Sequence, residues 1–261
     1  MFCLIMNKHF SLTGWICLLI AMLGLMTGCQ QRGSSLRIMS YNIRNLRGMD
    51  DVRDVGRVAK VINEAKPDVV AVQEVDSVTG RSEQTDVLGL LAAETHMHPV
   101  YAAAIDYDGG KYGVGILSKE QPISYYSIPL PGREELRVLL VVEFAHYLFG
   151  CTHLSLTEED RLRSLPLLTQ EAAKANKPFF IAGDWNATPN SSFIGELRQS
   201  FTLLSQPEQW TFPADVPDHT LDYVAIYGTK ELPVSVKRTQ VVDEPMASDH
   251  RPVVVEVTLP K

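Results

Sequence analysis

The stretch FFIAGDWNATP, Phe179 to Pro189, decides the fold class of this chain. Its apolar start is typical of a buried strand, and the proline ends the pattern. Asp184 and Asn186 therefore follow a buried strand directly. The question is why an aspartate and an asparagine stand side by side at that strand's carboxyl end.

Around this stretch, short apolar runs alternate with amphipathic segments, which predicts an α/β (α+β) fold with layered sheets and helices outside. Strands are predicted over 36–43, 68–75, 112–118, 136–145, 147–153, 178–184, 221–228, 235–242 and 252–259. Helices are predicted over 50–65, 86–95, 158–176 and 191–200. The third helix has a capping-box-like start at Thr157, and Pro166 predicts a kink or a boundary within it. Residues 108–113, DGGKYG, predict a Gly-Gly hairpin turn.

Polar residues stand at the ends of many of these strands. If the later strands run antiparallel to the earlier ones, carboxyl and amino ends meet at one edge, and these side chains converge there. Each of them alone is explained equally well as an ordinary turn or surface residue. The residues at carboxyl ends are Asn42, Glu74, His153, Asp184 and Asn186, and those at amino ends are Asp222, Asp249 and His250.

Several carboxylates on one rim repel each other, so we expect a cation among them. Oxygen ligands favour Mg²⁺, with Mn²⁺ or Ca²⁺ as alternatives, and the chain has no Cys-x-x-Cys or His-Glu-x-x-His pattern that would favour zinc. His96 and His98 lie near Pro99 in an expected loop, where solvated surface is the better interpretation. Because protein-bound Mg²⁺ often completes its shell with substrate phosphate, the pattern indicates phosphate chemistry.

The motifs resemble those of the endonuclease/exonuclease/phosphatase superfamily, which includes deoxyribonuclease I-like nucleases, neutral sphingomyelinases and inositol-polyphosphate phosphatases. The matching segments are MSYNIR (39–44), QEV (73–75), YGVGILSK (112–119), CTHL (151–154), AGDWNATP (182–189), LDYVAI (221–226) and SDHRPV (248–253). The resemblance implies a four-layer sandwich, in which two mixed β-sheets pack face to face and helices flank them.

The resemblance also implies a role for each matching position. Glu74 would be the principal metal ligand, with Asn42 and Asp249 in support. Asp184 and Asn186 would position the attacking water and hold the phosphate. His250 would act as general base or as a charge-stabilising imidazolium, oriented by Asp249 or Asp222, and His153 would donate to a phosphate oxygen.

Three further side chains are weaker candidates for substrate binding. Arg81 and Arg161 could hold phosphate, but arginines at such positions are more often solvated surface charges or members of a structural ion pair. Ser164 stands where relatives often have glutamine, which leaves the helix face beside Arg161 open. Trp210, in the proline-rich stretch 206–220 with Phe212, could stack on a base or sugar, cover a lipid headgroup, or fill the core.

Together these features predict hydrolysis of a phosphodiester with nuclease-type chemistry. The alternatives are a phosphomonoesterase or sphingomyelinase-like activity at the same centre, and a non-catalytic surface lipoprotein. The substrate class extends from nucleic acid to phospholipid or sugar phosphate. The formal net charge of −7 and the lack of a Lys/Arg run weigh against a protein that grips nucleic acid by charge alone.

The amino terminus has the pattern of a lipoprotein signal. The apolar run 15–26 has the length of a signal-peptide core and is too short to span a membrane as a helix. LMTGC, residues 25–29, resembles a lipobox, which implies lipidation at Cys29 and a membrane anchor. Gln30 resembles the outer-membrane sorting pattern of Gram-negative lipoproteins, which places the protein in the cell envelope.

The expected division of the chain follows from this signal. Residues 1–28 form the signal peptide, 29–35 a polar tether and 36–261 one catalytic domain. Cys3 and Cys17 leave with the leader and Cys29 carries the lipid, so a structural disulfide is excluded in the mature monomer. Cys151 is predicted to be a small buried apolar residue.

Overall fold

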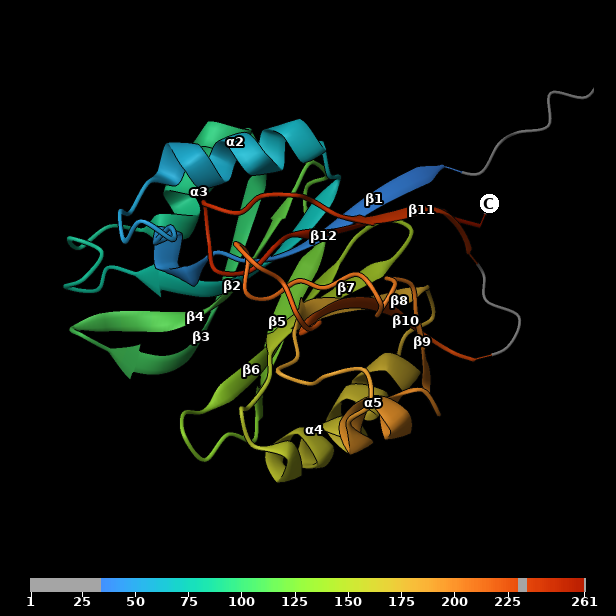
Figure 1. Cartoon of the computed structure of the whole chain (residues 1–261). Helices are drawn as coiled ribbons and strands as arrows, with labels where there is room; N and C mark the ends of the chain where they lie inside the picture. The colour runs from blue at the N-terminus through green and yellow to red at the C-terminus, as the bar shows by residue number, and fades with distance from the viewer. Residues whose placement is uncertain (1–33, 230–233, 261) are drawn as a thin grey trace, which may run out of the picture. The chain divides into compact units, whose positions relative to one another are not determined.

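Two six-stranded β-sheets face each other across an apolar core, and helices cover their outer faces (Figure 1). This computed structural model describes residues 34–229 and 234–260. The four-layer sandwich implied by the sequence motifs is thus confirmed. None of the helices within the described ranges has the length and apolar character needed to cross a membrane.

The first sheet has the strand order β11-β12-β1-β2-β4-β3 and is mixed. β1 runs parallel to β2, whereas β12 pairs antiparallel with β1 on its other side. The strands span β1 (Ser35–Asn42), β2 (Val69–Ser77), β3 (His98–Tyr107), β4 (Gly110–Ser118), β11 (Ser235–Val241) and β12 (Val253–Thr258).

The second sheet has the order β5-β6-β7-β8-β10-β9 and is also mixed. β7 runs parallel to β8, and β10 pairs antiparallel with the other side of β8. The strands span β5 (Ser124–Leu130), β6 (Arg137–Glu143), β7 (Leu148–His153), β8 (Phe179–Asp184), β9 (Phe201–Leu203) and β10 (Asp222–Tyr227).

The core has three apolar layers, because both faces of each sheet are covered. The central layer joins the sheets through residues such as Ile38, Val255 and Phe180. A second layer packs α2 (Val55–Ala65) and α3 (Val87–Thr95) on the first sheet. A third packs α4 (Glu158–Ala173) and α5 (Ser192–Leu197) on the second sheet. Strands covered on both faces explain the continuous apolar runs in the sequence.

Three strands were missing from the sequence prediction, namely β3, β5 and β9. β3 contains Pro99, which suggested a loop, but β3 is the edge strand of its sheet, where proline is tolerated. His96 and His98 are exposed, as expected. The hairpin is confirmed, because Tyr107 pairs with Gly110 and both intervening residues have positive φ. Its two central residues are Asp108 and Gly109, not the two glycines that the sequence suggested.

Several predicted helix bounds were wrong. The expected helix 50–65 begins at Val55, because the Asp54 carboxylate accepts from Arg57 N at 3.0 Å and caps it there. The side chain of Thr157 makes no capping hydrogen bond, so the expected capping box is absent from α4. That helix also continues through Pro166 and ends at Ala173, three residues early, while α5 is shorter at both ends than the predicted 191–200.

A β-bulge in β2 is the local feature that matters most for function. The pairing of β2 with β4 shifts between Val72 and Val75, which leaves Gln73 and Glu74 outside the regular register. Glu74 has φ +59°, in the left-handed region that a non-glycine residue rarely adopts. Glu74 therefore does not close its strand, as the sequence suggested, because β2 resumes beyond it and ends at Ser77.

Candidate active site

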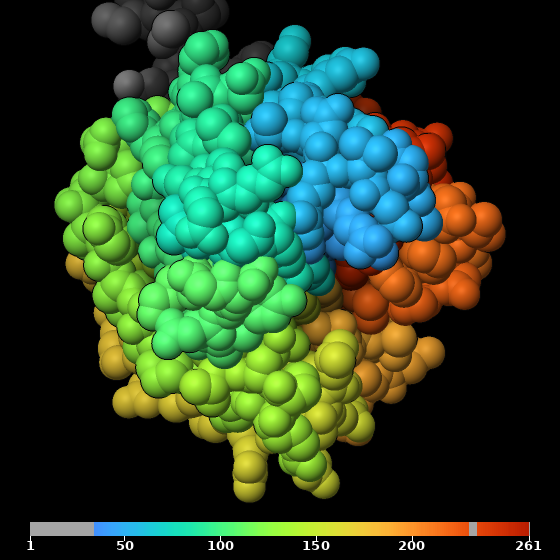
Figure 2. Space-filling view, turned by 90° about the vertical axis from the view of Figure 1, so that its left-hand side faces the viewer, coloured from blue at the N-terminus to red at the C-terminus, as the bar shows by residue number. Residues whose placement is uncertain are grey.

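Polar side chains from both sheets meet at one edge of the sandwich. Asp184, the last residue of β8, lies between His153 of β7 and Asp222 of β10 in the strand pairing. Asn42, the last residue of β1, reaches across from the first sheet and donates from Nδ2 to Asp184 Oδ2 at 3.0 Å. Figure 2 shows this edge of the sandwich from outside, and the surface is hollowed where blue, orange and yellow segments meet.

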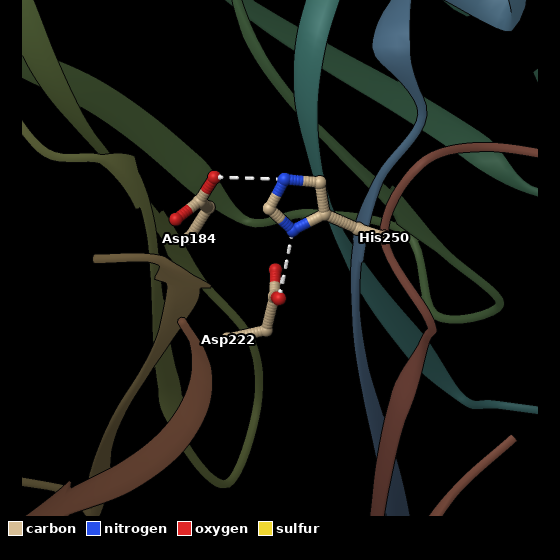
Figure 3. Close-up of side chains that lie close together, drawn as sticks. All are labelled: Asp184, Asp222 and His250. Carbon is tan, nitrogen blue, oxygen red and sulfur yellow. Dashed lines mark hydrogen bonds and ion pairs between the residues drawn. The ribbon is translucent and has the colours of Figure 1, made fainter. Parts of the chain in front are cut away.

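His250 lies between two aspartates (Figure 3). Its Nδ1 is 2.9 Å from Asp222 Oδ2, and its Nε2 is 3.6 Å from Asp184 Oδ2. Burial lowers the pKa of His250, but the neighbouring carboxylates of Asp222 and Asp184 outweigh that effect and raise it to about 10. The imidazole is therefore held as a cation at neutral pH, in an orientation set by Asp222.

His153 has the opposite protonation state, although it adjoins the same aspartate. Its Nε2 lies 3.5 Å from Asp184 Oδ2. Burial lowers the pKa of His153 to about 3, and the attraction of Asp184 only partly opposes this. The site thus holds one charged and one neutral imidazole around Asp184.

Glu74 reaches the same edge from the bulge in β2. Asn42 donates from its amide to Glu74 Oε1 at 3.0 Å as well as to Asp184, while its Oδ1 accepts from Arg44 N at 3.0 Å. Burial raises the pKa of Glu74, and the charges of Asp249 and Asp184 raise it further. The strained backbone of Glu74 is typical of residues held for function.

Asn186 and Asp249 are the last two of the eight polar residues that the sequence placed at strand ends. Asn186 N donates to Asp184 Oδ1 at 2.9 Å, and its side-chain amide donates to the carbonyl of Leu154 at 2.9 Å. Asp249 Oδ2 lies 3.3 Å from Arg44 Nε and is a quarter exposed. All eight residues that the sequence placed at strand ends therefore stand at this edge of the sandwich.

Arg81 and Arg161, two of the three weaker candidates, form their hydrogen bonds with residues outside this cluster. Arg81 binds both carboxylate oxygens of Asp76 at 2.7 Å, and its guanidinium lies over the ring of Tyr107, 4.4 Å from the centroid. The hydrogen bond to Asp76 raises the pKa of Arg81. Arg161 donates to the carbonyls of Ser155 and Leu156.

Trp210 is 53% exposed, so the suggestion that it fills the core is wrong. Its neighbour Phe212 packs against His250 instead, with ring centroids 4.7 Å apart. The same loop is tied to the His250 segment, because Ala214 N donates to the carbonyl of Asp249 at 2.7 Å. Phe212 thus covers one side of the charged imidazole.

Two residues at the site were missed by sequence reasoning. Ser248 donates to the carbonyl of Asn42 at 2.7 Å and accepts from His250 N at 3.3 Å, which ties the segment before β12 to the end of β1 within the first sheet. Arg137 lines a small cavity with Tyr112 and His153, and it is held by Glu134 and Glu135. Arg137 opens its strand as Asp222 does, so the strand-end argument could have found it.

The residues of this edge fit a hard divalent cation. One ligand atom from each of Asp184, Asp222 and His250 lies within 4.8 Å of the others, but a charged imidazole would oppose a metal there. Glu74 offers a better centre, because its pKa is raised by burial and by two nearby carboxylates, a repulsion that a cation would relieve. Carboxylate oxygens are the ligands that Mg²⁺ and Mn²⁺ prefer.

The arrangement combines a place for a cation, a fixed positive imidazole and an anionic acceptor. Negative charge that develops on a phosphoryl group would be stabilised by the cation and by the His250 imidazolium. Asp184, the anionic acceptor, lies next to His250. Preorganised charges in a partly buried site supply a large share of the rate enhancement in such reactions. The edge is therefore suited to phosphoester hydrolysis.

Comparison with known proteins agrees with this reading. Residues 39–250 match the model of the Endonuclease/Exonuclease/phosphatase family. The fold is similar to an endonuclease/exonuclease/phosphatase from Beutenbergia cavernae DSM 12333, with a TM-score of 0.70 and 23% identity over 87% of this chain and 72% of that one. A Bacteroides vulgatus protein of the same description has a TM-score of 0.72 and 17% identity over 87% of this chain and 99% of that one.

A mannosyl-6-phosphatase of Bacteroides thetaiotaomicron VPI-5482 is also similar in fold, with a TM-score of 0.67 and 16% identity. That similarity covers 85% of this chain and 99% of that one. No curated protein sequence matches this chain.

Proposed function

This chain belongs to the endonuclease/exonuclease/phosphatase family, and from that premise we propose that it is a metal-dependent hydrolase that cleaves a phosphodiester by in-line attack of water. The observation that carries the proposal is the position of His250 between Asp222 and Asp184, beside Asn42 and Glu74. We propose Mg²⁺ as the metal, with Mn²⁺ as a substitute, because the donors are hard oxygens.

Glu74 and Asp249 would hold the cation, and Asn42 would orient Glu74 through its amide. When bound there, the cation would neutralise charge on a non-bridging oxygen of the phosphate. This assignment agrees with the raised pKa of Glu74, because burial and the charges of Asp249 and Asp184 outweigh the opposing effects of Asn42 and His250, and a bound cation would offset them.

His250, Asp184 and His153 would act on the reacting groups. Asp222 keeps His250 charged and oriented, so the imidazolium would stabilise negative charge on the phosphoryl oxygens. Asp184 would orient the attacking water and accept its proton, with Asn186 N steadying its other oxygen. Neutral His153 would donate a hydrogen bond to the phosphate without changing its charge near neutral pH.

We further propose that the chain is a lipoprotein anchored at Cys29 in the outer membrane of a Gram-negative bacterium. The support is the sequence LMTGC at 25–29, after an apolar run of signal-peptide length. Mass spectrometry of the mature protein tests this directly. An unmodified Cys29, or a chain that keeps residues before it, would contradict the anchor.

A substrate panel tests the activity. The purified protein should hydrolyse bis(p-nitrophenyl) phosphate with Mg²⁺ or Mn²⁺, and EDTA should abolish the reaction. Parallel assays with p-nitrophenyl phosphate, plasmid DNA and sphingomyelin separate diesterase from monoesterase, nuclease and sphingomyelinase activity. His250→Ala should be inactive, whereas the exposed His98→Ala serves as the matched control. Inactivity of the metal-bound wild type on every substrate would favour a non-catalytic lipoprotein.

A further inference from the structure

The described chain begins at the end of the sandwich opposite to the site. β1 runs from Ser35 to Asn42, and Asn42 is the residue that contacts Asp184 and Glu74. An eight-residue strand is about 23 Å long between its first and last residues. Ser34 is fixed at the far end, because its carbonyl accepts from Leu259 N at 2.9 Å.

The tether between Cys29 and this point is short. Five peptide steps separate Cys29 from Ser34, and even a fully extended chain spans at most about 18 Å over that distance. If the site faced the bilayer that holds Cys29, Ser34 would lie at the far end of the domain. The tether would then have to run the whole length of β1 to connect Cys29 to Ser34. With Cys29 lipidated, the tether is shorter than that strand, so the site edge could not be turned to face the anchoring membrane.

The loops around the site also offer little unpaired positive charge to a polyanion. These loops are residues 43–54, 78–86, 108–109, 131–136, 154–157, 185–191, 204–221 and 242–252. They contain no lysine, and carboxylates outnumber arginines in them. Arg53 donates to Asn45 Oδ1, and the other loop arginines all bind a carboxylate. Those pairs are Arg44–Asp249, Arg47–Asp51, Arg81–Asp76, Arg133–Asp160 and Arg251–Asp243.

Polynucleotide binding draws most of its strength from cations that neutralise phosphates along the strand. An acidic rim on which every arginine except Arg53 is paired with a carboxylate would repel the phosphates that flank the scissile one. A small substrate brings a single phosphate to the cation and to His250. It has no flanking phosphates that the acidic loops would repel.

From these two relationships we propose that the natural substrate is a small, water-soluble phosphoester, and neither a lipid of the anchoring bilayer nor a polynucleotide. The inference rests on the proposed function and on lipidation at Cys29. It assigns to the anchor the task of displaying the site toward solvent.

The orientation can be measured without any substrate. The lipidated protein in phosphatidylcholine vesicles would carry a fluorophore at Val216→Cys, in the site-edge loop, or at Ile123→Cys, which precedes β5 at the far end. Both positions are exposed, at 72% and 61%, and the native Cys151 is buried. Nitroxide lipids should quench the label at position 123 at least several-fold more than the label at 216.

A variant with twenty Gly/Ser residues inserted after Gly33 serves as the control, and it should lose most of this difference. Equal or stronger quenching at position 216 in the native-length protein would overturn the orientation.

The substrate arm uses the same vesicles. The anchored enzyme should hydrolyse bis(p-nitrophenyl) phosphate in solution at least ten times faster than sphingomyelin in its own bilayer or a 20-nucleotide DNA strand. A rate on either of the latter that matches the soluble diester would overturn the inference. Loss of all hydrolysis with Mg²⁺ present would instead count against the proposed function, because the quenching experiment reports orientation independently.

Discussion

Asp184 and Asp222 lie directly opposite each other in the antiparallel pairing of β8 and β10. Two carboxylates at such close quarters repel, and His250 from the opposite sheet lies between them as their shared counter-ion. One strand pair therefore sets both the charge and the orientation of the imidazole. The chemistry of the site depends on the register of that pair.

Replacement of Asp222 by asparagine should slow catalysis more than it weakens binding. The amide keeps the size of the side chain but removes the charge that holds His250 as an imidazolium. We expect kcat to fall by about 10²–10⁴-fold while KM changes little, since proton-transfer and charge-stabilising groups act in the transition state. Steady-state kinetics on bis(p-nitrophenyl) phosphate measure this. Asp218→Asn, an exposed aspartate four residues away, is the control and should match wild type.

Replacement of Glu74 by glutamine should chiefly weaken metal binding. The change removes the negative charge and keeps the hydrogen-bonding shape beside Asn42. We expect Mg²⁺ affinity to fall by at least about tenfold, seen by isothermal titration calorimetry and as a higher Mg²⁺ requirement in the assay. The exposed Glu196→Gln on α5 provides the control. Full activity of Glu74→Gln at limiting Mg²⁺ would remove Glu74 from the ligand set.

The metal-free protein should lose stability toward alkaline pH because of His250. Its pKa is about 10 in the folded state and about 6.5 in an unfolded chain, so the folded state holds the proton more tightly. The resulting stabilisation, on the order of a few kcal/mol, is complete below about pH 6.5 and is lost as the pH rises through the folded value. Thermal unfolding in EDTA between pH 6 and 10.5 measures it.

His250→Asn should flatten this alkaline decline, and His98→Ala should not. An equally steep decline in His250→Asn would assign the effect to other groups.

Gly183→Ala should disrupt the strand that carries Asp184. A Cβ there would lie 1.9 Å from the carbonyl oxygen of Thr152 on the neighbouring strand. Because backbone atoms cannot give way locally, we expect a loss of about 3 kcal/mol in the free energy of unfolding, measured by urea denaturation. Gly195→Ala is the matched control, since its Cβ meets nothing within 4 Å and alanine favours the helix by up to about 1 kcal/mol.

Much of the fold could be predicted from the sequence because buried strands leave continuous apolar runs. β8 and β12 are of this kind, and both were found within a residue. β3 was not predicted because proline and alanine, which it contains at Pro99 and in three consecutive alanines, have low strand propensity. Its pairing with β4 stabilises it as a strand, and that pairing is a tertiary contact. β5 is an edge strand with several exposed side chains, which also weakens the apolar pattern.

The candidate site was predictable in its members but not in its contacts. Strand ends are visible in a sequence, so Asp184 and Asp222 could be placed at one edge. Glu74 reaches the site through a β-bulge, which is a change of register between β2 and β4. No residue type in the sequence predicts such a bulge. Nor could composition show that Asp76 engages Arg81, since that pair forms beyond the same bulge.

β12 lies between β1 and β11 in the first sheet, so two segments far apart in the sequence lie side by side. Until residues 253–258 emerge from the ribosome, that flank of β1 has no neighbour to complete its hydrogen bonds, and His250 has no fixed position. A nascent chain is therefore incomplete both as a structure and as a catalyst until residues 250–258 have been synthesised.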